Sequence, residues 1–163
     1  MHRHFLIPAA LVAALTAAAP ASAAQITAVT SVNVVKPVAL VKLQDMNFGT
    51  LTFAGFTGTR SVVLSRLGAI TCATDIVCSG ATTQARFNVT GTNKLTVLLT
   101  YSGGTLSNGT DSIPFTANGP ASITLTSSGA PGTDIDIGGA LTISPALVGG
   151  VYSGFMTVTA DYQ

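Results

Sequence analysis

The sequence contains no glutamate and no tryptophan, and its two histidines are His2 and His4, at the very start of the chain. Histidine is the side chain that most often exchanges protons near neutral pH, so general acid–base catalysis has few candidates here. A Ser-His-Asp triad cannot form from the residues after His4. We therefore expect no enzyme activity, no catalytic residue and no cofactor.

Charge is also scarce in this chain. Charged residues make up 8% of it, and seven Lys and Arg residues against six acidic ones leave a formal net charge of +1. Nucleic-acid binding depends on clustered positive charge, which this balance does not supply. Proteins with little net charge associate more readily than highly charged ones. The composition argues against a nucleic-acid partner and favours assembly with other subunits or display on a surface.

The one long apolar run lies at the N-terminus. A basic start, MHRH, precedes the run FLIPAALVAALTAAA over residues 5–19, and the small residues PASA follow. This order is typical of a Sec-type signal peptide. We predict a signal peptide over residues 1–23 and a single domain over residues 24–163, without a transmembrane anchor. Export would place the protein in the periplasm, on the cell surface or outside the cell.

Apolar and polar residues alternate along the rest of the chain, which predicts β-strands. Every second side chain is apolar in ARFNVTG (residues 85–91) and in KLTVLLTY (residues 94–101), and residues 91–93 would join these two as neighbouring strands. Further strands are expected in SIPFTA, ASITLTSS, DIDIGGALTIS and the closing residues. Many short strands separated by Gly, Pro, Asn or Ser predict an all-β protein. The expected architecture is an immunoglobulin-like antiparallel β-sandwich, with a closed barrel as the alternative.

The chain has two cysteines, Cys72 and Cys78. An exported protein meets an oxidising compartment, so we predict a disulfide between them. The closed loop is short, which limits the gain in chain entropy to about 2 kcal/mol, and the main effect would be to hold one turn or hairpin. Two thiolates without a nearby histidine make a poor metal site, so no metal is expected. The spacing also differs from the C-x-x-C pair of redox-active proteins.

Two aspartates stand close together in GTDIDIGG, at Asp134 and Asp136. On a strand, residues i and i+2 point from the same face. The two carboxylates could then form a calcium site or an acid–base pair. The simpler interpretation, which the pattern favours, is a pair of solvent-facing aspartates that alternate with buried Ile135 and Ile137.

Both ends of the expected domain are predicted to be strands. In residues 24–35 one side is formed by Ile26, Ala28, Thr30, Val32 and Val34. This segment could be the first strand of its own domain, or a donor strand lent to a neighbouring subunit by β-strand addition. At the other end, one face of the closing strand is formed by Tyr152, Met156, Val158, Ala160 and Tyr162. Gly154 within this strand predicts a bend or a close neighbour.

Four stretches resemble a secreted bacterial family known only as domain of unknown function 4402: DMNFGTL (45–51), ARFNVTG (85–91), IDIGGALTI (135–143) and GVYSGFMTVTADYQ (150–163). Its members are similar in turn to subunits of chaperone-usher pili and to spore-coat U-type proteins. The last strand of those proteins carries a glycine near the fourteenth place from the end and a tyrosine next to last, which Gly150 and Tyr162 match. The resemblance implies a pilin-like fold, a periplasmic chaperone that holds the closing strand, and a groove for the next subunit's N-terminal extension.

The two cysteines depart from the usual pilin pattern, because they lie close together in mid-chain. With this reservation, we predict a non-enzymatic structural subunit of a surface fibre, pilus or coat. It would assemble with identical or related subunits by strand exchange or edge pairing, with residues 26–34 as donor and residues 150–162 as the strand beside the acceptor groove. The alternative is a self-complete, adhesin-like module. It would bind a glycan or protein through loops such as residues 101–112, where Tyr101 and Asn108 could stack and hydrogen-bond.

Overall fold

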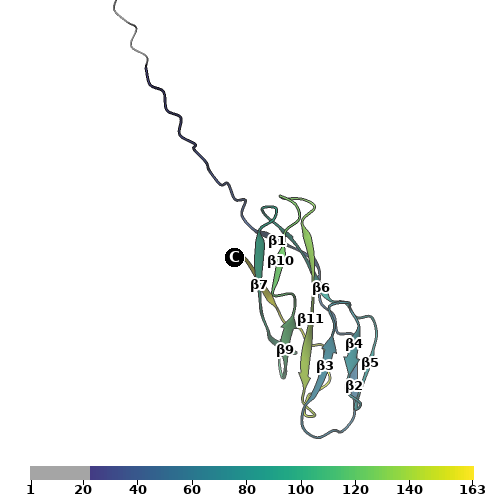
Figure 1. Ribbon diagram of the computed structural model, residues 1–163. Coiled ribbons are helices and arrows are strands. Elements are labelled where there is room, and N and C mark those ends of the chain that lie inside the picture. Colours follow the sequence, from purple (N-terminus) through teal and green to yellow (C-terminus); the bar gives the residue numbers. More distant parts are fainter. Residues whose placement is uncertain (1–22) are drawn as a thin grey trace, which may run out of the picture. The chain divides into compact units, whose positions relative to one another are not determined.

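In a computed structural model, which describes residues 23–163, every regular element is a β-strand (Figure 1). The all-β prediction is confirmed. The predicted signal peptide lies outside the described residues except for Ala23. The strands are β1 Ala39–Gln44, β2 Thr50–Phe53, β3 Arg60–Leu64, β4 Ile70–Cys72, β5 Ile76–Ser79, β6 Ala85–Thr90, β7 Thr96–Ser102, β8 Gly104–Ser107, β9 Ser112–Asn118, β10 Ser122–Thr124, β11 Thr133–Ile143 and β12 Thr157–Tyr162. Within the described part of the chain, no helix is long and apolar enough to cross a membrane.

The strands form three antiparallel sheets. In the largest sheet the order is β1-β6-β11-β3-β4, with β9 also paired to β11 and β8 paired to β9. Residues 139–141 of β11 pair with β3 and β9 at once, so this long strand is the centre of the sheet (Figure 1). The second sheet has the order β10-β7-β12, and β2 and β5 form the third.

The strands β6 and β7 are not paired neighbours, which corrects the sequence-based expectation. β6 pairs with β1 and β11, whereas β7 pairs with β10 and β12, so residues 91–93 carry the chain from one sheet to another. The alternation in both strands was identified correctly: Val89 and Val97 are fully buried. Alternation shows that one face of a strand is covered, but it does not reveal which strand lies alongside.

All buried apolar side chains of the described residues except Leu64 fall into two clusters. The Ile137 cluster consists of Ala85, Val89, Val97, Leu99, Leu125, Ile135 and Ile137. The Phe115 cluster consists of Phe56, Val62, Ile76, Ile113, Phe115, Leu141 and Ile143. Met46 and Met156 pack against both clusters, so they mark the boundary between the two halves of the core.

The described residues before β1 form no strand in this structure. Residues 23–38 have no regular structure, and Ile26 and Val32 are 99% and 85% exposed. Residues 34–163 form a compact unit that does not include residues 23–33. A donor strand forms only when it meets an acceptor, so the role of Ile26, Ala28, Thr30, Val32 and Val34 stays a prediction.

The closing residues, 149–163, are only partly a regular strand. β12 begins at Thr157, and upstream of it Ser153 makes a single antiparallel bridge with Ser107. The expected two faces are nevertheless present, because Tyr152, Met156, Val158, Ala160 and Tyr162 are half-buried and the residues between them are exposed. Gly154 lies against the carbonyl oxygen of Thr105, where a Cβ atom would clash. This close approach confirms the role predicted for Gly154.

Candidate functional site: an open apolar groove

A groove of about 770 Å³ opens beside the Phe115 cluster. Its floor is made of side chains that are almost fully buried in the core, among them Ile113, Phe115, Leu141 and Ile143. One wall is formed by residues 147–156, and the facing wall by residues 42–53. The volume lies in the range of about 300–1,000 Å³ that is usual for binding sites. The arrangement offers an apolar surface between residues 147–156 and the segment that contains β2.

The wall of residues 147–156 is held mainly through the β8–β9 hairpin. The Val148 N–H donates to Asp111 Oδ2 at 2.9 Å, and Ser153 exchanges two backbone hydrogen bonds with Ser107, at 2.8 and 3.0 Å. The Tyr152 hydroxyl donates to the Val148 carbonyl oxygen at 2.7 Å. Partial burial, and to a lesser extent the charge of Asp111, raises the pKa of Tyr152. The sequence alone did not single out Asp111 as an anchor for this wall.

The facing wall was missed by the sequence analysis. Leu51 and Phe53 of β2 are half-buried and line the groove, while Thr52 between them is exposed. The spacing i, i+2 of these two apolar side chains is the signal that could have revealed the strand. Gly49, with φ of +73°, lies just before β2 and so close to Ser79 that a Cβ atom would lie 2.5 Å from the Ser79 carbonyl oxygen.

The predicted disulfide between Cys72 and Cys78 is present, with a Cα–Cα distance of 6.4 Å. The loop that it closes contains the expected turn, in which the Ile76 N–H donates to the Ala73 carbonyl oxygen at 2.9 Å, but β4 and β5 are not paired as a hairpin. Cys72 ends β4, which pairs with β3 in the largest sheet, and Cys78 lies in β5, which pairs with β2. The bond therefore joins the β2–β5 pair to the main sheet instead of closing one hairpin.

The residues predicted for the closing strand fall into two groups. Gly150, Tyr152 and Met156 line the groove. Val158 and Tyr162 pack against the Ile137 cluster instead. The Tyr162 hydroxyl donates to the Lys36 carbonyl oxygen at 2.7 Å and accepts from the Thr92 N–H at 2.6 Å.

Tyr162 therefore ties three parts of the chain together: the residues before β1, the connection from β6 to β7, and the end of β12. Gly91 makes room for this, because a Cβ atom there would lie within 3.0 Å of the Tyr162 hydroxyl oxygen and of Leu125. The tyrosine next to the C-terminus closes the Ile137 half of the core and does not line the groove.

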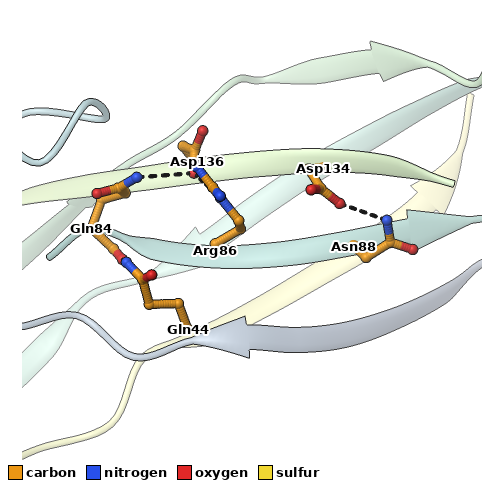
Figure 2. A network of polar contacts seen from close by, with 6 residues as sticks. All are labelled: Gln44, Gln84, Arg86, Asn88, Asp134 and Asp136. Carbon is orange, nitrogen blue, oxygen red and sulfur yellow. Dashed lines mark hydrogen bonds and ion pairs between the residues drawn. The ribbon is translucent and has the colours of Figure 1, made fainter. Parts of the chain in front are cut away.

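The aspartate pair lies on the outer face of β11, opposite β6 (Figure 2). Arg86 Nε donates to Asp136 Oδ1 at 2.7 Å, and Asn88 Nδ2 donates to Asp134 Oδ1 at 2.6 Å. The hydrogen bond with Arg86 lowers the pKa of Asp136, and the same contact raises the pKa of Arg86. Across the described residues, no group of three or more acidic, histidine or cysteine side chains could hold a metal ion. Each carboxylate serves as a cross-strand partner on a polar surface.

The stretch proposed as a recognition loop, residues 101–112, is mostly strand and tight turn. Tyr101 ends up half-buried, its hydroxyl donating to the Pro120 carbonyl oxygen at 2.7 Å, and burial raises its pKa to about 12. Asn108 Oδ1 accepts the N–H groups of Thr110 and Asp111 at 2.9 and 2.7 Å. Polar atoms of both residues expected to contact a ligand are thus engaged inside the protein.

Comparison with known proteins gives one match. No curated protein and no solved structure matches this chain. Residues 38–162, which include β1 through β12 and both walls of the groove, match the family described as Domain of unknown function (DUF4402). The chain therefore belongs to the DUF4402 family.

Proposed function

We propose that this protein is an exported structural subunit of a surface fibre, pilus or coat, in which the groove receives an extended segment of another copy. In this proposal the domain is an immunoglobulin-like, pilin-like β-sandwich that a strand from its neighbour completes. The observation that carries the proposal is the apolar groove between residues 147–156 and residues 42–53. The role requires no catalytic residue and no cofactor.

An extended strand suits this groove because the backbone of its two walls has few pairing partners of its own. In the described part of the chain, β2 is paired only with β5, and residues 147–156 make one bridge, between Ser153 and Ser107. Free strand edges present unpaired N–H and C=O groups, which readily accept another strand. Main-chain hydrogen bonds would supply affinity, and the floor would select apolar side chains at alternate positions.

The occupant that we propose is residues 24–35 of a second copy. Its side chains carry no charge, and the α-amino group that signal-peptide cleavage would leave on Ala24 lies at the end of the segment, so seating residues 26–34 would bury no ionic group. Ile26 and Val32 are almost fully exposed, and burying a side chain of this size contributes about 1.5–3 kcal/mol. They share one side of the extended segment with Ala28, Thr30 and Val34, which is the side that would face the floor.

Assembly of this kind needs an exported chain and protection of the groove before the next subunit arrives. The N-terminal residues 1–23 provide the predicted Sec-type signal. We propose that the protein is delivered to the periplasm, the cell surface or the medium, with a periplasmic chaperone occupying the groove on the way. The predicted partners are identical or related subunits.

The alternation of the segment allows a matched test. We expect the exported chain to form oligomers whose size grows with concentration, measured by size-exclusion chromatography with light scattering. The double substitution Ile26→Asp with Val32→Asp should leave monomers, because two charges would enter the apolar floor. The matched control, Thr27→Asp with Asn33→Asp, adds the same charges on the opposite side and should still assemble. A wild-type chain that is monomeric at every concentration would refute the proposal.

A further inference from the structure

We propose that the strand entering the groove pairs with β2, and that the Cys72–Cys78 disulfide holds β2 in the position that makes this pairing possible. The inference rests on the proposed function, because it concerns how the same groove binds the same segment. It gives the mid-chain disulfide a part in recognition.

The position of the groove favours β2 over β1 as the second edge. Of β1, only Lys42 and Gln44 line the groove, whereas Leu40 packs against the Ile137 cluster in the other half of the core. The β1–β6 ladder then becomes irregular between Lys42 and Gln44, and the strand ends there. The groove begins at these two residues and continues along residues 45–53. A strand lying on the groove floor therefore passes beside β2.

The backbone of the opposite wall has groups available for pairing. Ser153 directs both of its backbone groups toward Ser107. Within the described part of the chain, Tyr152 and Gly154 on either side of it make no backbone–backbone hydrogen bond. Both residues line the groove. An entering strand would thus find hydrogen-bonding partners on the 147–156 wall as well as on β2.

The β2–β5 pair has no ladder with the main sheet, and a two-stranded pair is marginally stable alone. Its base is fixed by a bridge in which Asn47 and Thr83 exchange backbone hydrogen bonds at 2.8 and 2.9 Å. The disulfide acts further along, because Leu51 of β2 lies directly opposite Cys78. Cys72 in turn lies opposite Val62, a fully buried core residue of β3. The covalent link therefore runs from the groove wall to the core.

A second set of contacts supports the C-terminal end of β2. Phe53 packs edge-to-face on Phe56 at 5.5 Å between ring centroids, and the guanidinium of Arg60 lies 5.1 Å from the centre of the Phe56 ring. Arg60 also forms an ion pair with Asp75 at 2.7 Å, in the turn before β5. Exposed ion pairs contribute little, so we expect the disulfide to be the stronger brace.

Hydrogen exchange tests which edge is used. The acceptor is the full exported chain carrying Ile26→Asp and Val32→Asp, which leaves its groove free, and the probe is a synthetic peptide of residues 24–35. We expect the peptide to slow exchange in residues 50–53 and in residues 151–156. Protection of residues 39–44 and 151–156 without residues 50–53 would overturn the inference and leave the proposed function standing. Protection of none of them would overturn both.

Removal of the disulfide tests the brace. In the same acceptor, Cys72→Ser with Cys78→Ser should weaken peptide binding by about tenfold or more, which corresponds to about 1.4 kcal/mol. Exchange in β6 and β11 should stay slow while exchange in β2 and β5 becomes faster. A matched control is Val77→Ser, an exposed residue of β5 away from the groove lining, which should bind as before. Reduction of the unsubstituted disulfide provides a second route to the same state.

Unchanged affinity after either treatment would overturn the bracing role. Loss of protection in β6 and β11 after both treatments would overturn it too, because the disulfide would then maintain the whole fold and not the position of one wall.

Discussion

The two halves of the core differ in how the closing residues cover them. In the Ile137 half, β12 pairs regularly with β7, and Tyr162 bonds both to the residues before β1 and to the β6–β7 connection. In the Phe115 half, the same chain makes one bridge, between Ser153 and Ser107, and a groove remains open to the core. One half is complete within the chain, and the other presents apolar side chains for a partner.

Three glycines and the position of the strands explain this difference. Gly149, Gly150 and Gly154 lie in the first part of the closing residues, which forms no regular ladder, and glycine weakens a strand in which it stands. Downstream of Gly154 the alternation is unbroken up to Tyr162. The closing residues therefore cover the apolar side chains of the Ile137 half, whereas apolar surface of the Phe115 half remains accessible in the groove. We expect substitutions in the two halves to affect different properties.

The largest expected effect is on stability, from a cavity in the complete half. Ile137→Ala should lower the free energy of unfolding by about 2–5 kcal/mol, because Ile137 is fully buried. Leu51→Ala, in the groove wall, should cost only about 1 kcal/mol, since that side chain is half exposed in the free domain. Urea denaturation of the two variants measures the contrast. Equal losses would show that the two halves are equally complete.

An added methyl group at Gly91 should come next in size. Gly91→Ala would place a Cβ atom against the Tyr162 hydroxyl and Leu125, and overpacking of this kind costs about 1–3 kcal/mol. Gly109→Ala is a suitable comparison for crowding, because no atom lies within 4 Å of the position its Cβ would take. The positive φ of Gly109 still adds some backbone strain. A thermal melt in which Gly91→Ala is the more stable of the two would contradict the close contact.

Loss of the Tyr162 hydroxyl should have a smaller effect that is confined to the same half. Tyr162→Phe removes one donated and one accepted hydrogen bond, and we expect a loss of about 1–2 kcal/mol. Binding of the residue 24–35 peptide to the groove should not change. A variant with normal stability and weakened peptide binding would reverse the assignment of Tyr162 to the closed half.

The smallest expected effect is a change in acid sensitivity on the outer face. The bond from Arg86 lowers the pKa of Asp136 in the folded state, so the stabilisation is present above the unfolded pKa of about 4 and is lost as the pH falls through the folded value. Asp136→Asn should therefore lose less stability than the wild type between pH 5 and pH 2. The measurement is the urea midpoint of both proteins across this pH range. If the two midpoints fall in parallel, the stabilising contact between Arg86 and Asp136 is contradicted.

The sequence predicted those features that depend on local pattern. Alternation located the strands around Val89, Val97 and Ile137, the export signal suggested the disulfide, and spacing placed Asp134 and Asp136 on one outer face. Strand partners were not predictable in the same way, because identical alternation fits several pairings. The separation of β6 from β7 into two sheets is an example.

The residues that line the groove were also predicted only in part. Gly150, Tyr152 and Met156 were singled out from the closing residues, but Tyr162 was grouped with them although it lies in the closed half. The facing wall came from Leu51 and Phe53, whose short strand carries only two apolar residues. Its pairing with β5 joins segments that β3 and β4 separate in the sequence, which a local pattern does not reveal.

The most direct test of the central claim is a photo-crosslinking experiment on mixed chains. A photoreactive amino acid replaces Val32 in isotopically heavy chains, which are unfolded and reassembled with unlabelled chains before irradiation, and mass spectrometry identifies the products. We predict links from position 32 of a heavy chain to groove residues 147–156 or 42–53 of a light chain, and far fewer when the label replaces Asn33. Links that join position 32 only to its own chain, or to surfaces away from the groove, would contradict the account.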